Sequence, residues 1–174
     1  MSKKSVRIAV LEVLGPMVQQ LRYRLLRLKG YRNIAPNVTI ERNVNLDRVF
    51  PGSVYIGEGS LVASSATILS HEHVYRDPTN PELPLHSPVY IGQRCFIGVG
   101  AVILPGVRIG DDCLIGAGAL VTEGKTFEPG SLIVGSPARA VKQLPPETLM
   151  LLKMGAAHYV DRAARYAAGL KRVD

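Results

Sequence analysis

At 174 residues the chain suits one domain and leaves too little for a second sizeable core. Apolar residues make up 47% of it and charged residues 20%, which is ordinary for a soluble globular protein. No run of about 18 apolar residues occurs, which argues against a transmembrane helix. The start also lacks an apolar signal region, so we expect a cytoplasmic protein.

The net charge of +7 is concentrated at the start of the chain. Residues 1–33 hold eight basic side chains and one acidic side chain, whereas the remaining residues hold thirteen of each sign. Residues 6–14 and 17–29 are predicted helices, interrupted at Gly15-Pro16 because proline breaks the hydrogen-bond ladder. An apolar stripe with basic flanks marks the second helix and consists of Met17, Val18, Leu21, Leu25 and Leu28. Two interpretations are open: a cap on the first coil of the repeat that follows, or a helix lying on an anionic membrane surface.

From residue 34 the sequence repeats every six residues. An aliphatic side chain begins each block, and the side chain four residues later is compact. The aliphatic positions are Ile34, Ile40, Leu46, Ile56, Val62, Ile68, Ile91, Ile97, Ile103, Ile109, Ile115 and Val121. A helix requires a period near 3.6 and a free-standing strand a period of about 2, so a sustained period of six predicts short strands joined by turns. Three blocks make one three-sided coil, and stacked coils pair their backbones, as in a hexapeptide β-helix.

Two interruptions divide the repeat. The segment from Asp47 to Tyr55 is four residues too long, which predicts a small bulge around Phe50-Pro51-Gly52. The longer interruption is residues 69–90, and a long excursion from a regular repeat is usually a functional loop or a disordered one. It holds three of the four histidines of the chain: His71, His73 and His86.

The repeat predicts an all-β solenoid with a helical segment at each end. We expect a basic helical segment at residues 1–33, the repeat domain at 34–144 with its loop at 69–90, and a helix-prone segment at 145–174. Cys95 and Cys113 occupy equivalent inward positions one coil apart. We interpret them as two buried small apolar side chains rather than as a disulfide or a metal site.

The blocks IGVGAVILPGVRIGDDCLIGAGALVT, at residues 97–122, and the later VGSPAR resemble the left-handed β-helix acyltransferases. The similarity is greatest to the branch of maltose, galactoside and polysaccharide O-acetyltransferases, and it covers roughly residues 34–144. The resemblance implies a left-handed parallel β-helix, a homotrimer, and acetyl-coenzyme A (acetyl-CoA) bound as acyl donor in the groove between neighbouring subunits.

The resemblance also implies roles for individual residues. His71, in ILSHEH, aligns with the catalytic histidine of the family, and a histidine with its ordinary pKa near 6.5 suits a general base at neutral pH. His73 and His86 are second choices for that role. The predicted donor-binding residues are Phe96, Val99, Ala117, Thr122, Arg139 and Lys142. A backbone N–H near Val99 would meet the developing oxyanion, and the two basic side chains would lie near the phosphates.

We therefore predict an acetyl-CoA-dependent O-acetyltransferase that acts on a sugar hydroxyl, in a cell-surface polysaccharide precursor, in the cytoplasm or at the inner face of the membrane. N-acetylation of an amino sugar on the same scaffold is the nearer alternative. A γ-type carbonic anhydrase with His71, His73 and His86 as zinc ligands is disfavoured because the ligands of that family lie inside regular coils. A nucleic-acid-binding module or an inactive scaffold is also disfavoured, since few aromatic side chains are interleaved with the arginines. We expect no metal and no nucleic-acid partner.

Overall fold

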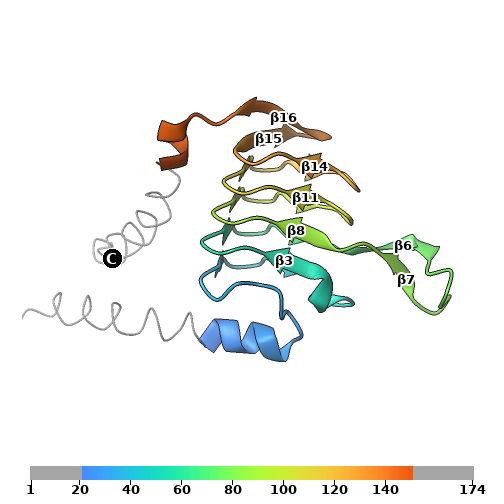
Figure 1. Ribbon diagram of the computed structural model, residues 1–174. Helices are drawn as coiled ribbons and strands as arrows, with labels where there is room; N and C mark the ends of the chain where they lie inside the picture. Colours follow the sequence, from blue (N-terminus) through green and yellow to red (C-terminus); the bar gives the residue numbers. More distant parts are fainter. Residues whose placement is uncertain (1–20, 151–174) are drawn as a thin grey trace, which may run out of the picture.

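The structure of the protein is a computed structural model that describes residues 21–150 (Figure 1). The predicted helix at residues 6–14, the first part of the helix at 17–29 and the chain beyond residue 150 lie outside the described residues. Within residues 21–150 the chain consists mostly of short strands stacked in layers, so the mostly-β architecture predicted from the repeat is confirmed.

Three sheets, which we name A, B and C, form the sides of the stack. Sheet A contains β3 (Val54–Ile56), β8 (Val89–Ile91), β11 (Arg108–Ile109) and β14 (Thr126–Phe127). Sheet B contains β1 (Thr39–Ile40), β4 (Leu61–Val62), β9 (Phe96–Ile97), β12 (Leu114–Ile115), β15 (Ser131–Gly135) and β16 (Ala138–Gln143). Sheet C contains β2 (Asn45–Leu46), β5 (Thr67–Ile68), β10 (Val102–Ile103) and β13 (Leu120–Val121).

The chain visits sheets A, B and C in turn and then starts the next coil. Neighbouring strands within each sheet are parallel, except that β16 turns back antiparallel on β15. In the regular region Val102 pairs with Leu120, and Arg108 pairs with Thr126, so one coil takes three six-residue blocks. Residues separated by one coil therefore lie directly above one another along each sheet and each corner.

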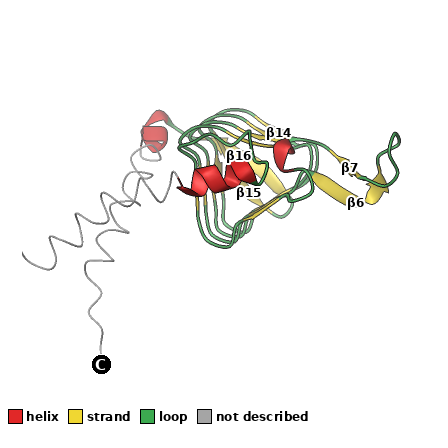
Figure 2. Cartoon of the chain, turned by 90° about the horizontal axis from the view of Figure 1, so that it is seen from below, coloured by secondary structure: helices red, strands yellow, loops and turns green. Residues whose placement is uncertain are grey.

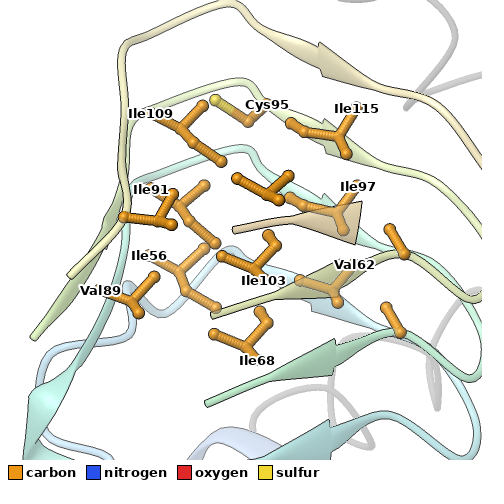
Figure 3. Close-up of a cluster of buried hydrophobic side chains, with 14 of the residues drawn as sticks. Ile56, Val62, Ile68, Val89, Ile91, Cys95, Ile97, Ile103, Ile109 and Ile115 are labelled. Carbon is orange, nitrogen blue, oxygen red and sulfur yellow. The ribbon is translucent and has the colours of Figure 1, made fainter. Parts of the chain in front are cut away.

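The aliphatic positions of the repeat fill the interior of the stack (Figure 3). Ile68, Ile97, Ile103 and Ile115 are fully buried, and the compact positions predicted to point inward, such as Ala101, are buried with them. Cys95 and Cys113 lie among these positions in consecutive coils, and both are free thiols. The Cys95 thiol donates to the Gly110 carbonyl at 3.1 Å, so it contributes to the packing between coils.

Glycine is required where successive coils approach most closely. A Cβ atom built on Gly110 would lie 2.5 Å from the backbone nitrogen of Pro129 in the next coil. Gly124 differs, because its φ of +65° is left-handed but nothing lies within 4 Å of the place a Cβ would occupy.

We expect Gly110→Ala to lower the free energy of unfolding by about 3 kcal/mol, because the backbone of Pro129 would have to move. Gly124→Ala is the matched control, and we expect it to cost only about 1 kcal/mol for the left-handed conformation. Urea unfolding of the two variants checks this order, and an equal or larger loss for Gly124→Ala would contradict it.

Both interruptions of the repeat lie at the corner between sheets C and A. The shorter one forms a 3₁₀ turn, η1 (Pro51–Ser53), at the predicted bulge. The longer one forms an antiparallel hairpin of β6 (His71–Arg76) and β7 (Pro84–His86), which projects sideways from the stack (Figures 1 and 2). The Ser87 N–H donates to the Ser70 carbonyl at 2.8 Å, so the coil closes across the base of the hairpin.

The two ends of the described chain are helical. Residues 21–28 form a helix across the end of the first coil, where Leu26 packs against the core (Figure 2). The apolar stripe predicted for this helix does not face the coil, since its described members, Leu21, Leu25 and Leu28, are exposed. At the other end, residues 146–150 are helical. No helix within residues 21–150 is long and apolar enough to cross a membrane.

Candidate functional site

The site begins at the corner between sheets C and A, which we name the C–A corner. The residues that follow the sheet C strands occupy this corner in successive coils: Asp47, Leu69, Leu104 and Thr122. After Leu69 the regular path continues for one more residue, and His71 then starts the hairpin. His71 therefore projects from a rigid coil rather than from a loop tip, which favours a fixed position for its imidazole.

His71 is held by a buried carboxylate from the coil below. Its Nδ1 lies 2.6 Å from Oδ2 of Asp47, and the side chains of the two residues are 8% and 0% exposed. Because an ionised carboxylate only accepts hydrogen bonds, Nδ1 is assigned as the donor. The neutral ring then carries its proton on Nδ1 and its basic lone pair on Nε2.

Asp47 is kept ionised by a dense set of donors. Its Oδ1 accepts from the backbone N–H groups of Val49 and Phe50, and its Oδ2 accepts from the backbone N–H and hydroxyl of Ser70 as well as from His71. Burial raises the pKa of Asp47, but these hydrogen bonds outweigh it and bring the pKa down to about 2. The carboxylate is therefore negatively charged at neutral pH, and its charge stabilises a proton gained by His71.

An aromatic side chain completes the setting of the imidazole. The Phe50 ring meets the His71 ring edge-on at 5.9 Å and stacks on the His86 ring at 4.2 Å. His71 and His86 are also paired across the base of the hairpin. His86 is exposed, whereas His71 is buried, and His73 lies within β6. None of the described side chains form a group of three or more His, Cys, Asp or Glu residues that could hold a metal ion.

Three predicted donor-binding residues lie along a different corner, between sheets B and C, which we name the B–C corner. Val99 follows β9 and is 54% exposed, and Ala117 lies one coil above it, where the Gly118 N–H donates to the Val99 carbonyl at 2.9 Å. Arg139 lies at the same end of sheet B one coil further, because it pairs with Val134 near the end of β15. Along successive coils the B–C corner therefore presents the apolar side chain of Val99, the small side chain of Ala117 and the cation of Arg139.

This corner leaves backbone open to a ligand. Gly100 and Gly118 lie on it with φ values of +66° and +67°, and nothing occupies the space within 4 Å of a Cβ built on either. Such a strip suits the close approach of an extended, amide-containing chain. The pantetheine arm of coenzyme A (CoA) has this chemistry, so the residues present fit the predicted donor.

The other predicted residues are dispersed. Phe96 is half-buried on the outer face of sheet B, and Lys142 is exposed on β16, opposite Leu132. Thr122 is half-buried on the C–A corner, two coils above Leu69. Within one chain, sheet C thus separates His71 and Thr122 from Val99, Ala117 and Arg139.

Sequence reasoning missed Asp47 and assigned Phe50 only to a bulge. A signal was present, since Asp47 is the acidic member of a corner column that is otherwise Leu69, Leu104 and Thr122. Asp47 begins the segment that is four residues too long. A count of one regular coil from Asp47 therefore does not reach Leu69, and the bulge hid the alignment of the two residues.

Comparison with known proteins agrees with the repeat and the fold. Residues 88–123 match the family model described as the hexapeptide repeat of succinyl-transferase. Nodulation protein L of Rhizobium meliloti is 43% identical over 112 residues, which cover 62% of this chain and 58% of that protein. A candidate acetyltransferase of Dictyostelium discoideum is 45% identical over 94 residues, or 53% of this chain and 48% of that one. The chain thus spans about half the length of the curated relatives it matches.

Solved structures share the architecture. A maltose O-acetyltransferase from Clostridium difficile is similar with a TM-score of 0.54 and 26% identity, over 71% of this chain and 75% of that one. A mutant N-acyltransferase from Bacillus cereus, solved with dTDP and CoA, has a TM-score of 0.55 and 19% identity, over 72% and 70% of the two chains. The second likeness concerns the fold alone.

Proposed function

Since the chain resembles the hexapeptide-repeat acyltransferases in its repeat and its fold, we propose that it is an acetyl-CoA-dependent acetyltransferase with His71 as general base. The buried Asp47–His71 pair is the observation that carries this proposal. It lies where the repeat opens, and it couples an imidazole to a carboxylate that stays ionised. General bases are built in this way, because the carboxylate fixes the ring and stabilises its protonated form.

The reaction is a direct transfer. The acceptor hydroxyl attacks the thioester carbonyl of acetyl-CoA while Nε2 of His71 takes the hydroxyl proton. A backbone N–H near Val99 stabilises the developing oxyanion. The carbon–sulfur bond then breaks, and protonated His71 returns the proton to the departing thiolate, so the products are an acetyl ester and CoA.

Separation of the two corners supports a site shared between copies of the chain. His71 on the C–A corner would face the B–C corner of a neighbouring copy, which would supply the Val99–Ala117 strip and Arg139. Thr122, Phe96 and Lys142 would line the remaining donor surface. We propose that the repeat domain, residues 34–144, winds left-handed and assembles as a homotrimer with three such sites.

A sugar hydroxyl is the proposed acceptor. The similarity to a maltose O-acetyltransferase at 26% identity supports a hydroxyl over an amine, and a polysaccharide precursor in the cytoplasm or at the inner membrane face would be within reach. The test is release of CoA thiol from acetyl-CoA across sugars, amino sugars and nucleotide sugars, with mass spectrometry of the products. If only amines were acetylated, the acceptor would be an amino group rather than a hydroxyl. If no acceptor caused thiol release, the proposal would be overturned.

Arg139 provides a second test, aimed at the donor. Because its exposed guanidinium would contact the phosphates, we expect Arg139→Gln to raise the KM for acetyl-CoA about tenfold and to change kcat little. Lys125→Gln removes an equally exposed charge elsewhere on the coil and should leave the KM unchanged. Steady-state kinetics with varied acetyl-CoA separates the two, and equal effects would argue against a specific role for Arg139.

A further inference from the structure

The helix at residues 21–28 carries exposed leucines on the side away from the coil. Leu26 packs against the core. Leu21, Leu25 and Leu28 are 58%, 47% and 83% exposed. With about 3.6 residues per turn, these three leucines form one stripe, and Leu26 lies on nearly the opposite side. The helix therefore covers the coil with one face and offers an apolar stripe to its surroundings with the other.

Cations border this stripe on both sides. Arg22 and Lys29 lie on one flank and Arg24 on the other, and all three are exposed. No acidic residue occurs from residue 21 to residue 40, so nothing nearby in the sequence neutralises the cations. A narrow apolar stripe between cationic flanks is typical of helices that lie in the plane of a membrane.

We propose that this helix binds an anionic membrane surface. The three leucines would enter the boundary between headgroups and acyl chains, while the arginines and the lysine reach lipid phosphates along their apolar stems. A protein partner is a poorer match, because three leucines on two turns offer little area for a stable interface.

The position of the helix gives the bound protein an orientation. The helix crosses the end of the first coil, so the stack would stand upright on the membrane (Figures 1 and 2). The C–A corner, with His71 in the second coil, would lie close to the lipid surface. Membrane binding itself does not depend on acetyl transfer, so its failure and the failure of the proposed enzyme activity can be told apart.

The test is co-sedimentation of the full chain with phosphatidylglycerol-containing vesicles and with pure phosphatidylcholine vesicles. We expect binding to the anionic vesicles and release at high salt. Changing Leu21, Leu25 and Leu28 together to serine should weaken partitioning about tenfold or more. The pair Arg22→Gln and Arg24→Gln should weaken it by about tenfold as well.

Matched variants make these results interpretable. Val141 and Met150, at the opposite end of the stack (Figure 1), are similarly exposed apolar side chains, and changing both to serine should leave binding unchanged. Arg108→Gln with Lys125→Gln removes the same charge from later coils, farther from the helix, and should also have no effect. Equal binding to neutral vesicles, or full binding by the triple leucine variant, would overturn the proposal. A change of oligomeric state in that variant, or preferential binding of duplex DNA, would overturn it in favour of a protein or nucleic-acid partner.

Discussion

We expect His71→Ala to lower kcat for acetyl transfer by about 10²–10⁴-fold, the usual contribution of a positioned general base. The KM for acetyl-CoA should change little, because Val99, Ala117 and Arg139 lie on the other corner of the chain. Thiol release under saturating donor and acceptor measures the first value, and titration of acetyl-CoA measures the second.

His86→Ala is the control for this prediction. His86 stacks on the same phenylalanine as His71, but it is exposed and does not contact Asp47 through any described hydrogen bond. We expect it to lower kcat by less than about tenfold. If His86→Ala or His73→Ala removed activity and His71→Ala kept it, the base would be misassigned.

Asp47→Asn should lower both activity and stability. All five hydrogen bonds to Asp47 come from donors, so an asparagine must turn its NH₂ group towards donors in either orientation. We expect a loss of about 3 kcal/mol in the free energy of unfolding and a fall in kcat of about 10²-fold or more. Urea unfolding and thiol release measure the two effects.

The acid stability of the protein follows from the same residue. Folding lowers the pKa of Asp47 from its ordinary 3.8 to about 2, so its contribution is fully present above pH 3.8 and is lost as the pH falls towards 2. This difference between the pKa values in the unfolded and folded states adds about 2 kcal/mol to the free energy of unfolding at neutral pH. Asp47→Asn should therefore lack this part of the acid dependence. Glu123→Gln, at an exposed position of the coil, is the control and should behave like the parent protein.

The part of the fold that follows the six-residue repeat was predictable from the sequence. The aliphatic residues from Ile91 to Val121 place every strand of the regular coils, because each block has two inward positions, four residues apart, and one turn. The hairpin at 71–86 and the return of β16 on β15 were not predicted. Their strands carry no six-residue phase, and their pairing depends on contacts that arise only once the coils are stacked.

The site was predictable only in part for a related reason. His71 is visible in the sequence because it ends a regular block, whereas Asp47 contacts it from 24 residues earlier across a bulge. Periodicity also identified the leucine stripe of the first helix but could not assign its direction. Within residues 21–28, Leu26 is the leucine that packs against the narrow core, and the larger apolar face turns outward.

The hydrogen bond from Ser87 to Ser70 makes the hairpin an appendage to the coil rather than part of its winding. Its outer residues, 74–83, can therefore lengthen, shorten or change composition without breaking the path from one layer to the next. Under the proposed function, such changes would alter the surroundings of an acceptor while the His71 imidazole and the Asp47 carboxylate stay in place at the base of the hairpin. The same coil could therefore serve different substrates while keeping its general base.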